Sequence, residues 1–298
     1  MTGPSGFQIE IRAGDHVATV VEVGGGIRRY AVGAVDVLDG YDADAICRSG
    51  RGQLLLPWPN RIREGAYAFA GEQRQLALTE PSTRSAIHGL VRWANWTLAE
   101  REEHRAVLRH TLHPQPGYPH TLELVVEYAL DGAGLAVETT AVNAGREPCP
   151  FGAGAHPYLA VRGGTVDVSV LRLPARTRLL ADEHGIPTGA EPVDGTPFDF
   201  RGGRPIGSTA LDTAFADLER DADGRARVRL DDTVVWLGEA YRYAMLFTGD
   251  PLPDVARRSL AVEPMTCAPN AFQSGDGLLV LEPGESFSAS FGIEPNAS

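Results

Sequence analysis

Two residues of this chain have a type and a setting that suit proton transfer, and one of them is His156. It lies in the segment FGAGAHPYLAV, where glycines leave room for close backbone approach and the following proline favours an extended conformation. Imidazole is the side chain whose unperturbed pKa lies nearest to neutral pH, so a histidine displayed in this way is suited to act as an acid or a base. The segment alone is equally compatible with a turn histidine that bonds to the backbone.

Glu263 is the second such residue. It follows the strand-like run 259–262 and precedes Pro264, which we expect to end the strand because proline cannot donate to a ladder. Its apolar neighbours Val262 and Met265 should keep water from the carboxyl, and desolvation raises the pKa of such a group toward a value useful for a base. The competing interpretation is a solvated glutamate at a strand edge.

Four further polar residues could bind a hydroxyl-rich ligand. Asn60 and Arg61 follow LLLPWP and should lie where a strand ends, and the five N–H donors of arginine suit hydroxyl or oxyanion oxygens. His88 shares a segment with Trp93, and an aromatic face beside a polar donor is typical of a sugar site. Asp212 opens LDTAFADLE, where its alternative role is to cap a short helix. Arg61 could also simply pair with a surface acid.

Other chemistries are excluded or disfavoured by composition. All 27 basic residues are arginine, so Schiff-base, P-loop and protein-kinase mechanisms, which need a lysine, are not available. His110 and His113 are three residues apart in a predicted strand, which places them on opposite faces, and no HExxH pattern occurs. We therefore expect no metal ion and no cofactor.

Strands are the elements that must position these residues. Residues 121–130 alternate apolar and polar side chains, and residues 135–142 do so again after Asp-Gly-Ala-Gly, which predicts a hairpin. The run ESFSASFGI at 285–293 alternates in the same way. Further strands are expected at 7–11, 17–23, 52–56, 96–100, 105–112, 165–170, 228–230, 234–237, 243–247, 259–262 and 278–281.

Helical patterns are few. Residues 211–219 could form one or two turns and residues 253–258 one turn, while the stretch 172–210 is rich in loop residues. Without amphipathic helices between the strands, a doubly wound or α/β-barrel fold is unlikely to form from this chain. We predict an all-β fold with a single domain over residues 1–298.

Charge and composition limit the partners. The formal net charge of −12 argues against nucleic acid and against an anionic membrane surface, since both attract positive proteins. Three widely spaced cysteines predict no disulfide framework, and we recognise neither a leader peptide nor an apolar span. We expect a cytoplasmic monomer or homodimer that binds a small molecule.

Five short motifs resemble the aldose 1-epimerase (galactose mutarotase) family, in the family's order and over nearly the whole chain. They are NRI at 60–62, IHG at 87–89, GAHPYL at 154–159, LDTAF at 211–215 and VEP at 262–264. The resemblance implies a large antiparallel β-supersandwich, which agrees with the all-β prediction from the strand patterns.

The resemblance also implies a reaction and a role for each residue. Glu263 would be the general base that takes the proton of the C1 hydroxyl, and His156 the general acid that protonates the ring oxygen. The ring of a neutral aldohexose, or of a related sugar, would open and reclose as the other anomer. Arg61, His88 and Asp212 would bind hydroxyl groups, with Asn60 supporting them, and no metal would take part.

Departures from the family pattern leave alternatives open. LPWPNR stands where GRxxNR is common, PYLAV replaces PYFNL, and PMTCAPNAF follows the glutamate in place of a Glu-Thr-Gln type of run. A hexose-6-phosphate epimerase would use arginines at the pocket mouth, and four lie near the motifs: Arg51, Arg63, Arg84 and Arg92. A non-catalytic sugar-binding protein could use the same pocket. A glycoside hydrolase would pair Asp212 with Glu263 and leave His156 without a role.

Overall fold

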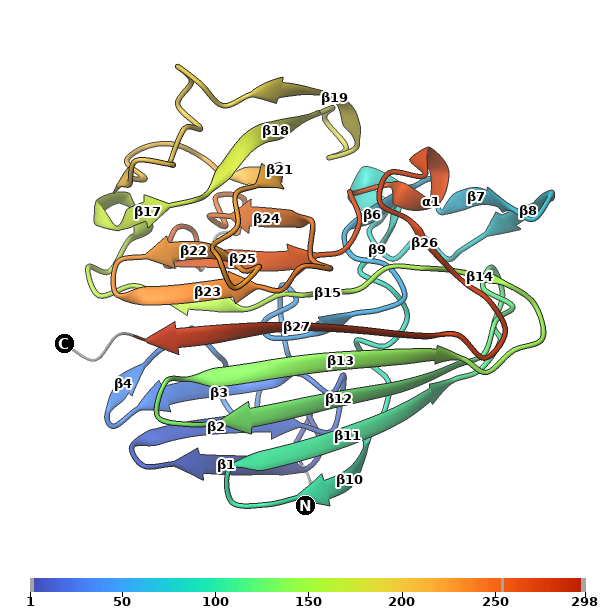
Figure 1. Ribbon diagram of the computed structural model, residues 1–298, viewed down its shortest axis with the longest axis horizontal. Coiled ribbons are helices and arrows are strands. Elements are labelled where there is room, and N and C mark those ends of the chain that lie inside the picture. Colours follow the sequence, from blue (N-terminus) through green and yellow to red (C-terminus); the bar gives the residue numbers. More distant parts are fainter. Residues whose placement is uncertain (1–2, 253–254, 296–298) are drawn as a thin grey trace.

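Nearly all regular structure in this protein is β-strand. The computed structural model describes residues 3–252 and 255–295, and its strands form three larger sheets and three two-stranded ladders with antiparallel pairing (Figure 1). The all-β prediction is therefore confirmed. No helix among the described residues has the length and apolar character that crossing a membrane requires.

A nine-stranded sheet extends from β10 at the bottom of the molecule to β17 at its upper left in Figure 1. In spatial order its strands are β10 (Thr97–Arg101), β11 (Arg105–Leu112), β12 (Leu122–Leu130), β13 (Leu135–Asn143), β27 (Ser286–Pro295), β23 (Thr233–Leu237), β22 (Ala226–Leu230), β17 (Val170–Arg172) and β20 (Arg204–Pro205). The predicted hairpin of β12 and β13 is present, and alternate β12 residues are buried as the period-two pattern requires.

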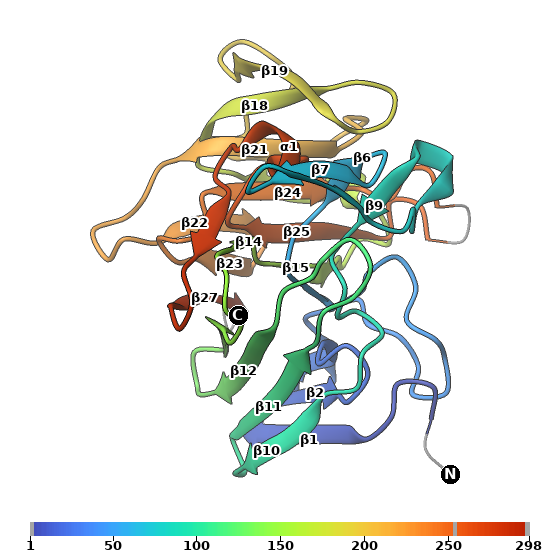
Figure 2. The ribbon, with the colours of Figure 1, turned by 90° about the vertical axis from the view of Figure 1, so that its right-hand side faces the viewer.

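An eight-stranded sheet forms the upper part of the molecule (Figures 1 and 2). Its strands in spatial order are β19 (Pro187–Pro192), β18 (Ala175–Ala181), β21 (Asp212–Leu218), β24 (Tyr243–Phe247), β25 (Ser259–Met265), β15 (Gly154–Ala155) and β5 (Leu54–Leu55), with β16 (Tyr158–Ala160) also paired to β25. All seven residues of β25 are buried, so this strand lies at the centre of the protein.

The remaining elements are smaller. A four-stranded N-terminal sheet contains β1 (Gln8–Ala13), β2 (His16–Val21), β3 (Ile27–Val32) and β4 (Val35–Asp36). The two-stranded ladders are β6 (Arg61–Arg63) with β9 (Ser85–Ile87), β7 (Ala66–Phe69) with β8 (Glu72–Gln75), and β14 (Cys149–Phe151) with β26 (Leu279–Leu281). Helical structure among the described residues comprises two 3-10 turns, Pro81–Thr83 and Val166–Val168, and α1 (Ala271–Ser274).

One continuous apolar core joins these sheets. It includes Ile11 of β1, Tyr128 of β12, Phe291 of β27 and Val262 of β25, all nearly inaccessible to solvent. The Tyr128 hydroxyl donates to the backbone oxygen of Gly25, which ties the nine-stranded sheet to the N-terminal sheet. The sheets therefore share one interior, and burial of apolar surface there is the main stabilising contribution to the fold.

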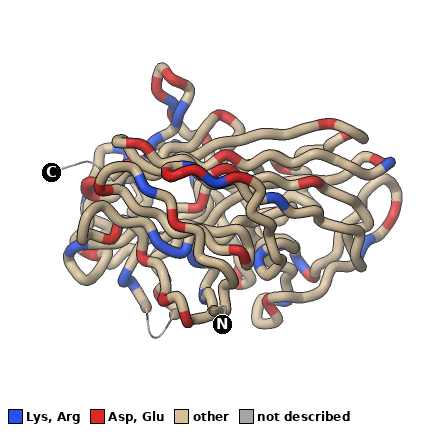
Figure 3. Tube along the Cα trace, turned by 90° about the horizontal axis from the view of Figure 1, so that it is seen from below, with Lys and Arg blue, Asp and Glu red and all other residues tan. Residues whose placement is uncertain are grey.

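Charged residues are distributed over the outside of this core. Figure 3 shows acidic and basic residues interspersed along the described chain, and many of the arginines are paired with carboxylates. The three cysteines are buried and free, as their spacing predicted.

Two expectations about local structure are wrong. Residues 212–218, within the stretch 211–219, form strand β21 instead of a helix, because Asp212–Phe215 pair with β24 and this pairing overrides a weak local helical preference. Residues 166–168 form a 3-10 turn where a strand was expected. The loop-rich stretch 172–210 contains β18, β19 and β20. The turn predicted at 253–258 lies partly outside the described residues, and residues 255–258 are not helical.

Candidate active site

The short β6–β9 ladder brings two of the sequence motifs together. Arg61 is paired with Ile87, and just beyond this pair the backbone N–H of His88 donates to the Asn60 oxygen at 2.9 Å. Asn60 and His88 both adopt left-handed backbone conformations, with φ of 56° and 61°. Gly89 follows in the same region of φ, and any side chain there would overlap the backbone oxygen of Leu56. Arg61 thus begins a strand, whereas the sequence placed it at the end of one.

The ring orientation of His88 is fixed by the backbone. Its Nδ1 accepts a hydrogen bond from the Asn60 N–H at 3.2 Å, so Nδ1 carries no proton. Burial lowers the pKa of His88 well below its ordinary value, and the nearby charges of His156, Arg92 and Arg61 add to this effect. The imidazole is therefore neutral at physiological pH, with its proton on Nε2. His88 can donate one hydrogen bond from Nε2 to a ligand.

Arg61 is held by a carboxylate that the sequence motifs did not point to. Its Nε and Nη2 lie 2.5 and 3.0 Å from the two oxygens of Glu80, which forms a bidentate pair. The side chains are only 13% and 25% exposed. The expectation that Arg61 could pair with an acid is therefore met, but by a largely buried acid beside the site.

His156 lies in the gap between β15 and β16. Its backbone N–H donates to the Gln53 oxygen and its oxygen accepts from Gly52, at 3.0 and 2.9 Å. Its ring stacks on Tyr158, with centroids 4.8 Å apart and planes within 9°. Against the ring lies Gly50, where an added Cβ would come within 2.8 Å of the ring carbon Cδ2. The imidazole is therefore fixed both at its backbone and at its ring.

Glu263 occupies the interior of β25, and here the sequence prediction needs correction. Pro264 does not end the strand, which continues to Met265. The N–H groups of Val262 and Thr266 donate toward Pro157 and Ala153, so the nitrogen of Pro264 faces the same side, between β15 and β16. No ladder donor is needed in that gap, which is where His156 lies. A proline is therefore tolerated within a central strand.

Glu263 and His156 form a buried pair. His156 Nε2 lies 3.3 Å from Glu263 Oε1, and the residues are 4% and 2% exposed, respectively. Burial raises the pKa of Glu263 well above its ordinary value, with a further contribution from Asp212, and burial lowers the pKa of His156 to about 3. Both shifts favour the uncharged forms, so over a wide pH range the pair holds one proton.

Asp212 lies at the beginning of β21, paired with Phe247 of β24, and therefore does not cap a helix. Solvent reaches its side chain, yet surrounding protein removes enough water to raise the pKa of its carboxyl, an effect that Arg61 opposes. Its charge in turn raises the pKa of Glu263. Asp212 thus belongs electrostatically to the same group of residues as Arg61 and Glu263.

One set of described residues has donor atoms close enough for a metal ion. Atoms of His88, His156 and Glu263 lie within 4.8 Å of one another, whereas the sequence had drawn attention to His110 and His113. Arg92 and Arg61 lower the pKa of His88, and Arg92 and Arg51 lower that of His156. The positive potential at the two histidines disfavours a cation there, so this arrangement suits proton transfer better than metal binding.

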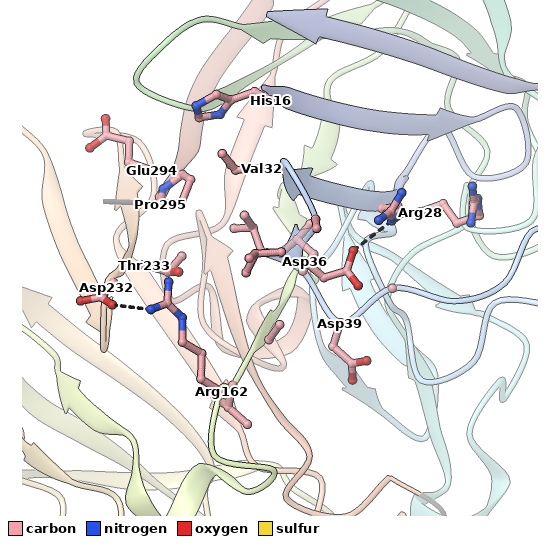
Figure 4. Close-up of a pocket in the computed structure, with 18 of the residues that line it drawn as sticks. His16, Arg28, Val32, Asp36, Asp39, Arg162, Asp232, Thr233, Glu294 and Pro295 are labelled. Carbon is pink, nitrogen blue, oxygen red and sulfur yellow. Dashed lines mark hydrogen bonds and ion pairs between the residues drawn. The ribbon is translucent and has the colours of Figure 1, made fainter. Parts of the chain in front are cut away.

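A large cleft lies elsewhere in the described part of the molecule. It has a volume of about 1280 Å³ and is bounded by β2–β4 and the ends of β23 and β27, with His16, Asp36, Arg162 and Asp232 among its walls (Figure 4). None of the six predicted site residues lines it. This cleft is therefore separate from the buried acid–base pair.

Glu80 and Gly50 are the residues of this region that the motif analysis missed. Glu80 is separated by 19 residues from Arg61, and no sequence spacing links the two. Gly50 is one of 34 glycines, and only the contact with the His156 ring distinguishes it. Among the aromatic residues near the motifs, Tyr158 contacts His156, Trp58 is buried against Phe272, and Trp93 is 57% exposed.

Comparisons with known proteins give one consistent result. A family model described as aldose 1-epimerase matches residues 8–294. The uncharacterized protein YihR of Escherichia coli (strain K12) is 34% identical over 290 residues, which cover 97% of this chain and 93% of that protein. The galactose mutarotase of Homo sapiens is 32% identical over 150 residues, which cover 48% of this chain and 42% of that protein.

Solved structures show the same fold. The GalM/aldose epimerase homologue from C. elegans superposes with a TM-score of 0.86 at 19% identity and covers 97% of this chain and 99% of its own. The galactose 1-epimerase from Lactobacillus acidophilus NCFM has a TM-score of 0.79 at 20% identity, with 96% and 93% coverage. The expected galactose mutarotase-like architecture is confirmed.

Proposed function

The chain belongs to the aldose 1-epimerase family, and we propose that it is an isomerase that interconverts the α and β anomers of an aldohexose. The observation that carries the proposal is the buried pair of Glu263 and His156, 3.3 Å apart. Glu263 Oε2 and His156 Nδ1 have no hydrogen-bond partner among the described residues. Anomer exchange removes a proton from one oxygen and delivers one to another, and a pair that shares one proton can do both.

Ring opening can be written with these two residues. Glu263 takes the proton of the C1 hydroxyl, the bond from C1 to the ring oxygen breaks as the C1 carbonyl forms, and His156 delivers its proton to the ring oxygen. Rotation about the C1–C2 bond and the reverse transfers then close the ring on the other face. The proton that rests on Glu263 in the free pair must move to His156 before ring opening, and it is again on Glu263 in the open-chain state, so none is exchanged with solvent.

The other residues would bind and orient the sugar. Arg61 keeps N–H groups that Glu80 does not use, His88 offers its Nε2–H, and Asp212 offers a solvent-accessible carboxylate. Asn60 supports these residues in two ways. Its backbone N–H fixes the His88 ring, and its side-chain oxygen accepts from the backbone N–H of Arg61. A site of this kind needs only a modest acceleration, because sugars mutarotate unaided and a positioned acid or base contributes about 10²–10⁴-fold.

The test is polarimetry with freshly dissolved α-glucose and α-galactose. We expect the wild type to accelerate the approach to anomeric equilibrium, and Glu263→Gln and His156→Asn to lose about 100-fold or more of that rate while still binding sugar. Glu64→Gln, which removes a carboxylate from an exposed ion pair with Arg84, is the matched control and should keep full activity. A wild type that binds sugar without interconverting anomers would be a sensor, and the proposal would be wrong.

A hexose-6-phosphate substrate is the second candidate, and one observation favours it. Of the four arginines near the motifs, three are paired with a carboxylate: Arg51 with Asp39, Arg63 with Asp182 and Arg84 with Glu64. Arg92 has no carboxylate within 4 Å in the described part of the chain, and its guanidinium donates a hydrogen bond to the Ile87 oxygen at 3.4 Å. Its charge nevertheless lowers the pKa of both site histidines. A half-buried arginine without a counter-ion suits an anionic substituent.

The same polarimetric assay with α-glucose 6-phosphate separates the two candidates. Activity confined to the phosphate, lost in Arg92→Gln but kept in Arg84→Gln, would replace the neutral sugar with the phosphate as substrate. Arg84 is the matched control because it lies near the same motifs and its charge is already compensated by Glu64. Equal rates on both sugars, unaffected by Arg92→Gln, would remove the phosphate from consideration.

A further inference from the structure

We propose that Glu80 is a positioning residue for this site: it fixes the direction of the Arg61 guanidinium and offsets its charge before a sugar binds. The inference rests on the proposed function, because it assigns Arg61 to the sugar. Within the described residues, the Glu80 carboxylate bonds to Arg61 and Thr83 and makes no hydrogen bond or ion pair with Glu263 or His156, so it would act through Arg61.

The contacts of Glu80 form a closed arrangement. Arg61 donates to both of its oxygens, and the Thr83 hydroxyl donates to Oε2 from the adjoining 3-10 turn. Burial alone would raise the pKa of Glu80, but these hydrogen bonds and the charge of Arg61 outweigh burial and lower it. Glu80 is therefore ionised throughout the physiological range, and the pair is a permanent one.

The bidentate contact with Glu80 determines which N–H groups of Arg61 remain available to a sugar. A guanidinium has five N–H groups, and Glu80 uses one on Nε and one on Nη2, which leaves about three. Gly185, in the turn between β18 and β19, lies against Nη1 so closely that an added Cβ would come within 2.5 Å. The same turn is attached to β6 by the Arg63–Asp182 ion pair. Arg61 is thus confined by Glu80 and by the β18–β19 turn.

Burial distinguishes this pair from the other arginine–glutamate pairs of the region. Arg84 and Glu64 are 67% and 44% exposed, and such pairs contribute little and reorient freely. Arg61 and Glu80 are largely shielded from water, so removing the carboxylate would leave an uncompensated charge inside the protein. Because Arg61 is already fixed, less side-chain entropy is lost when a sugar binds.

The charge of Glu80 also matters for the acid–base pair. The titratable and charged groups that face Glu263 are His156, His88, Tyr158, Arg61 and Asp212. Arg61 lowers the pKa of Glu263, and Glu80 offsets part of the Arg61 charge. Without Glu80, Arg61 would act more strongly, the pKa of Glu263 would fall, and the alkaline limb of the rate profile would move to lower pH.

Two variants separate position from charge. Glu80→Asp keeps the charge but withdraws the carboxylate by one methylene, so we expect KM to rise about tenfold with the alkaline limb unmoved. Glu80→Gln removes the charge, so we expect a raised KM together with an alkaline limb shifted to lower pH. Glu64→Gln makes the same change in an exposed pair and should alter neither quantity.

A second readout does not depend on activity. A ¹³C NMR titration of the Glu263 carboxyl, assigned by its loss in Glu263→Gln, should show a lower pKa in Glu80→Gln and an unchanged one in Glu80→Asp. Wild-type values of KM and of the Glu263 pKa in Glu80→Gln would overturn the inference. If instead the wild type does not interconvert anomers, the proposed function fails, while the NMR titration and calorimetric sugar binding still test Glu80.

Discussion

At the scale of residues, burial of Glu263 and His156 has a chemical meaning beyond shielding them from water. Both pKa shifts favour the uncharged pair, with the proton on the carboxyl. In the proposed reaction this is the state reached when the ring has opened, whereas the charged pair is the state that attacks the closed ring. The low-polarity surroundings therefore stabilise the open-chain stage relative to the starting stage.

The shared proton determines the pH dependence we predict. Activity requires one proton on the pair. A second proton binds only near the lowered pKa of His156, about 3, and the single proton is lost only as pH rises through the raised pKa of Glu263. We expect kcat/KM, measured by polarimetry and corrected for spontaneous mutarotation, to be level from about pH 5 upward and to fall only as pH rises through the raised pKa of Glu263.

This expectation has a clear contrary result. If His156 titrated as a solvated histidine, activity would change around its ordinary pKa of 6.5. A limb of the wild-type rate profile at that pH, absent together with the activity in His156→Asn, would show that Glu263 and His156 do not share one proton in the way the geometry indicates.

At the scale of elements, the gap between β15 and β16 makes the site possible. It lets the chain bend away from the ladder beside β25, so that His156 approaches Glu263 in the middle of a buried strand. The segment beneath it, with Gly50 and Gly52, then closes against the histidine. In a regular sheet, successive side chains point to opposite faces and neighbouring strands leave no gap, so His156 could not approach Glu263 in this way.

Gly50→Ala tests this arrangement. The new Cβ would lie 2.8 Å from the His156 ring, and φ of +72° also strains alanine, so we expect loss of kcat and a stability cost of about 1 kcal/mol. Gly195→Ala is the matched control, because its φ is +71° and nothing lies within 4 Å of the added Cβ. Polarimetry should show loss of rate in Gly50→Ala only, and thermal unfolding should show destabilisation of both variants, larger in Gly50→Ala because of the overlap. An equal loss of rate in both would refute the positional role.

The sequence predicted long strands better than short ones. β11 and β24 match their predicted bounds because runs of eight and five residues rich in apolar side chains are long enough to be recognised as strands. β6, β15 and β16 have two or three residues each, too few for any period, and they are the elements that carry or flank Arg61 and His156. β21 was mistaken for a helix because its pairing with β24 is not encoded locally.

The candidate residues could be chosen from motifs, but their arrangement could not. Chain order placed His88 and Asn60 28 residues apart, and only the ladder reveals that one fixes the tautomer of the other. Pro264 suggested a strand end because its missing N–H is a liability in most ladders, and the gap that removes this liability is a tertiary feature.

At the scale of the whole molecule, the site carries a cost in stability that depends on pH. The folded-state pKa of Glu263 lies above its ordinary value of 4.5. The contribution of Glu263 to the free energy of unfolding is therefore fully present below pH 4.5 and is lost as pH rises through the folded-state pKa. Glu263→Gln removes this ionisation. We expect the variant to unfold about 2–4 °C higher than wild type at pH 8, with a smaller difference at pH 5.

Differential scanning calorimetry at both pH values checks this prediction. Glu64→Gln is again the control, since an exposed carboxylate should change Tm little at either pH. A Glu263→Gln variant that is less stable than wild type at pH 8 would mean that the buried carboxylate stabilises the fold, contrary to the sign derived above.

The position of β27 has a consequence for how the protein is made. This strand lies between β13 and β23, so it joins the two parts of the nine-stranded sheet, yet it follows every other described strand in chain order. Until residues 286–295 have been synthesised, the edge of β13 that pairs with β27 stays unpaired. A truncated chain that ends before β27 would therefore leave two parts of the sheet with unpaired edges, which are prone to aggregation.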